Sequence, residues 1–128
     1  MKSISDILSN LFTNKGVSYT NLSSDSFQER IHTLPVVLID VRTPEEYSLG
    51  HIPGAKNEDY YSGDFLRNVQ NSVGTDTPLA IYCRSGKRSE GAAKILSAAG
   101  YKVYNLAGGI LEWEKESLPL ETNSQQIQ

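Results

Sequence analysis

The sequence predicts one α/β domain of three layers, in which a central, mainly parallel sheet carries helices on both faces. Short apolar runs alternate along the chain with stretches whose apolar residues recur at helical spacing. One run, Val36–Asp40, is almost continuously apolar, which is typical of a strand buried on both faces of a parallel sheet. A chain of 128 residues, 38% of them hydrophobic and 21% charged, suits one globular domain with its own core.

The first third of the chain is predicted to hold two helices and a strand. The apolar residues of 4–11 recur at helical spacing, which predicts a short amphipathic helix packed on the domain. The stretch 17–22 (VSYTNL) predicts a strand. A helix follows, capped by Ser23 or Ser24 and stopped before Pro35.

Turn and capping residues divide the middle of the chain. Thr43 is suited to cap a short helix that begins at Pro44. A turn at 50–54 leads to a short extended piece at 55–57, and the apolar residues of 61–72 favour another helix.

Two more strands and two more helices are expected in the last third. The run 78–82 (PLAIY) predicts a buried strand, and 89–100 (SEGAAKILSAAG) predicts a helix that ends in glycine. The stretch 101–106 (YKVYNL) alternates in the manner of a strand. A glycine-rich turn then leads into a short helix ended by Pro119, and the polar tail 121–128 is expected to be frayed.

Composition argues against several classes of function. A net charge of −3 disfavours nucleic acid or a membrane surface as partner, and no stretch approaches the ~20 apolar residues of a membrane span. One cysteine excludes an internal disulfide, and with two histidines beside it no zinc site is expected. Nothing in the sequence calls for a metal, nucleotide or flavin cofactor, and no glycine-rich phosphate loop of the P-loop or Rossmann type occurs.

The N-terminal segment MKSISDILSNLFTNKG does not match the pattern of a secretory signal. It lacks the continuous apolar stretch and the small-residue cleavage site of such a signal. The expected compartment is therefore the cytoplasm. The periplasm is the alternative if an export signal has been trimmed.

The stretch CRSGKRS, from Cys83 to Ser89, lies between a predicted strand and a predicted helix and holds the only cysteine. The thiol is thus expected at a helix N-terminus, where unpaired N–H groups and the helix dipole favour an anion such as the reactive thiolate. We predict that Cys83 is a catalytic nucleophile; the alternative is an unreactive buried cysteine. The rest of the loop is predicted to bind the substrate, through Arg84, Ser85, Gly86, Lys87, Arg88 and Ser89.

Individual roles follow from the residue types in this loop. Gly86 is expected to have a positive φ, which lets the backbone amides turn inward. Arg84 and Lys87 are expected to orient an anionic substrate, the alternative being solvated surface charges. Arg88 lies unfavourably at a helix start, so it needs a partner, and we expect Glu46 or Asp40 to supply it.

Four residues outside the loop are predicted to support the site: Asp40, Arg42, Glu46 and His51. Asp40 and Cys83 both follow predicted strands, and the working site of such a sheet lies at the carboxyl ends of its strands. Asp40 and Arg42 are expected to hold loops together rather than to touch substrate. His51 is expected to bond to backbone or a carboxylate, with general acid–base catalysis as the alternative, whereas His32 is expected to be a surface residue.

Four blocks of this sequence together resemble the single-domain rhodaneses, a family of sulfurtransferases. They occur in the family's order and spacing: LIDVRTPEEY (38–47), GHIPGAKN (50–57), IYCRSGKRSEGAAKILSAAGY (81–101) and LAGGILEWEKESLP (106–119). The resemblance implies a rhodanese-like domain at 17–119. A helical extension at 1–16 and a flexible tail at 120–128 lie outside it.

The resemblance also implies a persulfide mechanism that needs no cofactor. The Cys83 thiolate would take the sulfane sulfur of a small anionic donor such as thiosulfate, releasing sulfite. The resulting Cys83 persulfide would lie among the backbone N–H groups of its loop. Cyanide or a thiol, including that of a sulfur-accepting protein, would then take the sulfur, which is covalent catalysis in two steps.

Two alternatives to an enzyme of this kind stay open. Related phosphatases and arsenate reductases have five residues between cysteine and arginine, whereas four separate Cys83 from Arg88. The shorter loop suits a single sulfur atom and leaves too little room for a tetrahedral oxyanion. The other alternative is a sulfur-carrier or interaction module that passes the persulfide sulfur to a partner protein.

Overall fold

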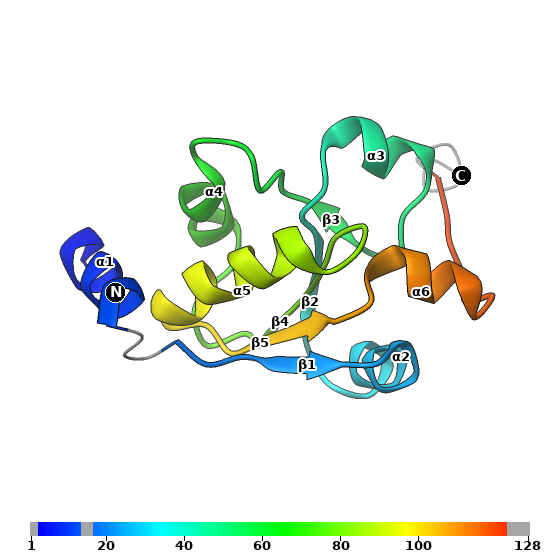
Figure 1. Ribbon diagram of the computed structural model, residues 1–128, viewed down its shortest axis with the longest axis horizontal. Coiled ribbons are helices and arrows are strands. Elements are labelled where there is room, and N and C mark those ends of the chain that lie inside the picture. Colours follow the sequence, from blue (N-terminus) through cyan, green and yellow to red (C-terminus); the bar gives the residue numbers. More distant parts are fainter. Residues whose placement is uncertain (1–2, 14–16, 123–128) are drawn as a thin grey trace.

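The computed structural model describes residues 3–13 and 17–122 and has a five-stranded sheet between two layers of helices (Figure 1). The strand order is β1-β5-β4-β2-β3, and all neighbouring strands are parallel. This confirms the predicted fold class. The strands are β1 (Thr20–Leu22), β2 (Val37–Asp40), β3 (Lys56–Asn57), β4 (Leu79–Tyr82) and β5 (Val103–Leu106). The helices are α1 (Ile4–Thr13), α2 (Ser24–Thr33), α3 (Pro44–Leu49), α4 (Phe65–Ser72), α5 (Lys87–Ala98) and α6 (Gly109–Lys115).

Each face of the sheet has its own apolar core. Residues of α1, α4 and α5 pack on one face, and residues of α2 and α6 pack on the other. Because successive side chains of a strand point to opposite faces, β4 sends Ile81 and the following Cys83 toward α5, and Tyr82 toward α6. The register of β4 therefore decides on which side of the sheet the thiol lies.

The N-terminal helix packs on the domain, as predicted. Ile7 of α1 is 4% exposed and belongs to the core beside α5, whereas Ile4 and Leu8 are exposed. None of the helices in the described part of the chain has the length and apolar composition that a membrane span requires.

Several elements are shorter than their sequence patterns predict, and β1 and α4 differ clearly at their starts. β1 begins at Thr20 rather than at residue 17, and α4 begins at Phe65 rather than at residue 61. Before α4, the Asp59 carboxylate accepts the N–H of Tyr61 at 2.9 Å, and the Ser62 hydroxyl accepts the N–H of Asp64 at 3.2 Å. Short polar side chains thus hold this segment in turns that compete with helix formation.

The chain returns to the domain after α6. The N–H of His51 donates to the C=O of Glu121 at 2.9 Å, and the N–H of Glu121 donates back at 2.8 Å. This antiparallel bridge fixes Glu121 against the domain, although sequence analysis assigns residue 121 to a flexible tail. Residues 123–128 of the predicted tail lie outside the described residues, as do residues 1–2 and 14–16 of the predicted extension.

Candidate active site

The Cys83 loop connects β4 directly to α5. Gly86 forms the N-cap of α5 with a φ of 104°, in the left-handed region, as predicted. A Cβ atom at Gly86 would collide with the backbone carbonyl of Ala107. Glycine is therefore needed here both for the conformation and for the space.

The Cys83 sulfur is buried but has polar neighbours. Cys83 is 1% exposed, and its Sγ accepts the N–H of Gly86 at 3.1 Å and the hydroxyl of Ser89 at 3.3 Å. Sequence analysis predicts several backbone amides turned toward the sulfur. Among the backbone amides of the described residues, only the Gly86 N–H donates a hydrogen bond to it. Arg84, Ser85 and Lys87, which sequence analysis predicts to bind the substrate, are exposed residues of this loop. The Gly86 amide and the Ser89 hydroxyl both direct a hydrogen-bond donor at the sulfur.

Arg88 is held by Glu46, one of its two predicted partners. Its guanidinium donates to both carboxylate oxygens of Glu46, at 2.7 and 3.0 Å, which joins α5 to α3. The hydrogen bonds from Arg88 and Thr43 lower the pKa of Glu46 from its usual 4.5 to about 2. Glu46 also completes a capping box with Thr43 at the start of α3. One carboxylate thereby stabilises two helix starts.

Glu46→Gln should destabilise the protein by about 2 kcal/mol at neutral pH and slow sulfur transfer by about tenfold. Because the folded pKa of Glu46 is depressed, its contribution is present above pH 4.5 and is lost as pH falls toward 2. Urea unfolding at pH 7 and pH 3 should therefore show a difference between wild type and variant that shrinks at pH 3. Glu45→Gln, on the exposed neighbour, is the matched control. Equal stability and kinetics for the wild type and Glu46→Gln would contradict a role for this pair.

Asp40, the other predicted partner of Arg88, is hydrogen-bonded to other residues. Its carboxylate accepts from Arg42 Nη2 at 2.7 Å and from the Tyr82 hydroxyl at 2.8 Å, and Arg42 Nη2 also donates to the Gly50 carbonyl at 2.6 Å. Asp40 and Arg42 are both buried. Burial raises the pKa of Tyr82, so its phenol remains a neutral donor. These contacts match the prediction that Asp40 and Arg42 hold loops together.

His51 is bonded to both kinds of partner that the sequence predicts. It is fully buried and its ring stacks on Tyr47, with centroids 3.8 Å apart. Its Nδ1 lies 2.9 Å from the Tyr47 carbonyl oxygen and its Nε2 lies 3.5 Å from the Glu121 carboxylate. These contacts favour a structural role over acid–base catalysis.

Sequence analysis missed the segment 107–111, which contacts the backbone of the Cys83 loop. The amides of Ile110 and Leu111, in α6, donate to the carbonyls of Cys83 and Arg84 at 2.9 and 3.2 Å. Gly109 has a φ of 66°, and a Cβ there would collide with the Arg84 carbonyl. The two consecutive glycines of the AGGI stretch were the one sign in the sequence that another backbone segment lies close to this turn. We call the two contacts, Gly86 on Ala107 and Gly109 on Arg84, the glycine interlock.

The sequence pattern of the Rhodanese-like domain family matches residues 23–116, which is more than half of the chain. This chain belongs to the rhodanese family. A protein of Allochromatium vinosum described as a sulfurtransferase is 37% identical over 101 residues, covering 77% of this chain and 92% of the relative.

Solved rhodanese structures share the fold. A rhodanese-like domain protein from Staphylococcus aureus is 30% identical with a TM-score of 0.70, covering 81% of this chain and 98% of that one. A rhodanese-related protein from Thermoplasma volcanium is 28% identical, also with a TM-score of 0.70, covering 80% and 98%.

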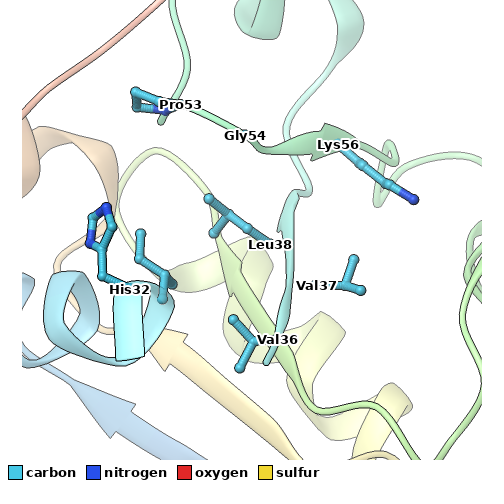
Figure 2. Close-up of a pocket in the computed structure, with 8 residues that line it drawn as sticks. His32, Val36, Val37, Leu38, Pro53, Gly54 and Lys56 are labelled. Atoms are coloured by element: carbon cyan, nitrogen blue, oxygen red, sulfur yellow. The ribbon is translucent and has the colours of Figure 1, made fainter. Parts of the chain in front are cut away.

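Two surface hollows of about 330 Å³ each lie at different places on this rhodanese domain. One reaches the Cys83 loop at Arg84. The other, shown in Figure 2, is lined by the end of α2, the first residues of β2 and the Pro53–Lys56 segment, with Leu38 near its centre. It contains no residue of the Cys83 loop, so it is not part of the candidate site. The described residues include no group of three or more His, Cys, Asp or Glu side chains suited to a metal ion.

Proposed function

We propose that this chain is a sulfurtransferase that carries sulfane sulfur as a persulfide on Cys83, from a donor such as thiosulfate to cyanide or a thiol. The observation that supports it most directly is the Cys83 sulfur at the N-terminus of α5, contacted by the Gly86 amide and the Ser89 hydroxyl. Membership of the rhodanese family and the sulfurtransferase relative support the reaction class.

The first step makes the persulfide. The Cys83 thiolate attacks the outer sulfur of thiosulfate, a new S–S bond forms, and the S–S bond of thiosulfate breaks as sulfite leaves with the electron pair. The added sulfur lies about 2 Å from Sγ. Arg84 and Lys87, both exposed cations, attract the dianionic donor.

The second step returns the thiolate. Cyanide carbon, or an acceptor thiolate, attacks the outer sulfur, and the Cys83–sulfur bond breaks with its electron pair left on Cys83. Thiocyanate or a new persulfide leaves, so no external oxidant or reductant is required. The Gly86 amide and Ser89 hydroxyl stabilise the Cys83 thiolate, which is the leaving group of this step.

The state of Arg88 disfavours phosphate chemistry. Both terminal nitrogens of Arg88 donate to Glu46, whereas a loop arginine that binds a phosphate or arsenate oxyanion would direct them at that oxyanion. The loop with four residues between Cys83 and Arg88 supports the same conclusion.

The proposal is tested by intact-protein mass spectrometry before and after thiosulfate, followed by cyanide. We expect a mass gain of one sulfur atom that cyanide removes as thiocyanate. A chain that gains no sulfur but releases phosphate from an aryl phosphate would instead support the phosphatase alternative.

Ser89→Ala should slow sulfur loading by about tenfold, because it removes one of the two donors to the Cys83 sulfur. Ser97→Ala, at a buried serine farther along the same helix, should load at the wild-type rate. Rapid-quench mass spectrometry measures both. Equal loading by the wild type and both variants would remove Ser89 from the mechanism.

A further inference from the structure

Exposed leucines gather around the hollow that reaches the Cys83 loop. Leu49, Leu111 and Leu120 all line it, and they are 84%, 41% and 36% exposed. The described chain has seven exposed large hydrophobic residues, so nearly half of them meet at this one place. Clustered exposed apolar side chains next to a candidate active site mark an interaction surface. We call this hollow, with Leu49, Leu111 and Leu120, the leucine groove.

Three separate elements build the leucine groove. Leu49 ends α3, Leu111 lies in α6, and Leu120 follows α6 in the segment that runs back toward α3 (Figure 1). The bridge between His51 and Glu121 holds that returning segment in place. The groove is therefore a preformed part of the fold, which lowers the cost of ordering a bound partner.

The groove is continuous with the candidate active site. Leu111 is bonded through its amide to the carbonyl of Arg84, the residue next to Cys83. Arg84 also lines the groove. A molecule lying on the leucines would thus reach the Cys83 loop at Arg84.

The charges of the groove favour an anionic occupant near the sulfur. Arg42 and Glu46 line it but are paired, with Asp40 and Arg88 respectively. Arg84 and Glu114 also line it; both are exposed, and neither forms an ion pair with any residue that the structure describes. Arg84 belongs to the Cys83 loop, whereas Glu114 lies about one turn of α6 beyond Leu111, so the unpaired charge beside Cys83 is positive. The Arg84 guanidinium is available to a carboxylate or thiolate.

We propose that the leucine groove docks a protein acceptor, which presents its thiol between apolar side chains with an acidic residue nearby. This inference rests on the proposed function and names the partner of its second step. Thiosulfate and cyanide have no apolar part to contact leucines. Leu49 projects into solvent, where a second protein surface can cover it.

The test separates docking from chemistry by comparing three acceptors. Protein loaded with sulfur from thiosulfate is mixed with cyanide, with an acidic peptide whose cysteine lies between two leucines, or with the same peptide carrying serines in place of leucines. Wild type should transfer sulfur to the leucine peptide with about tenfold higher kcat/KM than to the serine peptide. That ratio corresponds to about 1.4 kcal/mol, less than full burial of one leucine side chain supplies.

The variants place the effect on the groove. In a Leu49→Ser, Leu120→Ser double variant the preference should fall to about one, while transfer to cyanide is unchanged. Leu8→Ser, at an exposed leucine of α1, is the matched control and should keep the tenfold preference. Replacing the acidic residue of the leucine peptide by lysine should lower its rate, because Arg84 then repels it.

The outcomes are distinguishable. Transfer to cyanide without any preference between the peptides, or a preference that survives in the double variant, would overturn the docking inference alone. Failure to load sulfur or to pass it to cyanide would overturn the proposed function, and the docking inference with it.

Discussion

Cys83→Ser is expected to abolish sulfur transfer, lowering thiocyanate formation by at least about 1,000-fold. A serine hydroxyl is not ionised near neutral pH and forms no persulfide. The substitution is close in size, and the serine oxygen can still accept the Gly86 N–H that Cys83 accepts now, so stability should change little. The assay is thiocyanate formation with thiosulfate and cyanide, checked by the absence of a sulfur adduct in the intact mass.

The matched control for this variant is Ser97→Ala. Ser97 is a buried serine of α5 outside the Cys83 loop, and its hydroxyl donates to the Lys94 carbonyl at 3.2 Å. This variant should form the adduct and retain activity within a few-fold of wild type. Thiocyanate formation by Cys83→Ser at the wild-type rate would exclude a persulfide on Cys83.

Gly86→Ala is expected to lower sulfur transfer by at least about 100-fold and stability by about 2–4 kcal/mol. The alanine would have to adopt the positive φ of Gly86, and its Cβ would collide with the Ala107 carbonyl. Relief of that collision moves the Gly86 N–H, one of the two donors to the sulfur. Urea unfolding measures the stability, and a single turnover with thiosulfate measures the transfer.

Gly63→Ala provides the comparison for Gly86→Ala. A Cβ atom added at Gly63 would meet no atom of another segment within 4 Å, and Gly63 has no left-handed φ. Alanine should therefore be tolerated there, with wild-type transfer and equal or higher stability. If Gly86→Ala behaved like Gly63→Ala in both measurements, the glycine interlock would not be what shapes the loop.

The sequence was sufficient for features set by local patterns. The strand before Cys83, the helix after it and the positive φ at Gly86 follow from residues within one short stretch. The partner of Arg88 could be narrowed to two carboxylates, because the parallel sheet places Asp40 and Glu46 at the same edge as Cys83. The structure decides between them, because the Asp40 carboxylate is already hydrogen-bonded to Arg42 and Tyr82.

Contacts between distant segments could not be predicted from local patterns. Ala107 and Gly109 contact the Cys83 loop through backbone atoms. Backbone contacts do not depend on the side chain, so only the glycines that they require can be recognised in the sequence. Glu121 lies in a polar stretch that resembles a free tail, yet its backbone pairs with His51. The leucine groove likewise brings Leu49 of α3 beside Leu111 and Leu120, which lie much later in the sequence.

The glycine interlock has a consequence for a chain that is still being synthesised. The Cys83 loop is supported by residues 107–111, which leave the ribosome after the cysteine has emerged. Until they arrive, β4 lacks its neighbour β5, and the thiol is exposed on an unfinished surface. A nascent or prematurely terminated chain thus carries its cysteine unprotected and open to oxidation, while the finished protein encloses the same sulfur.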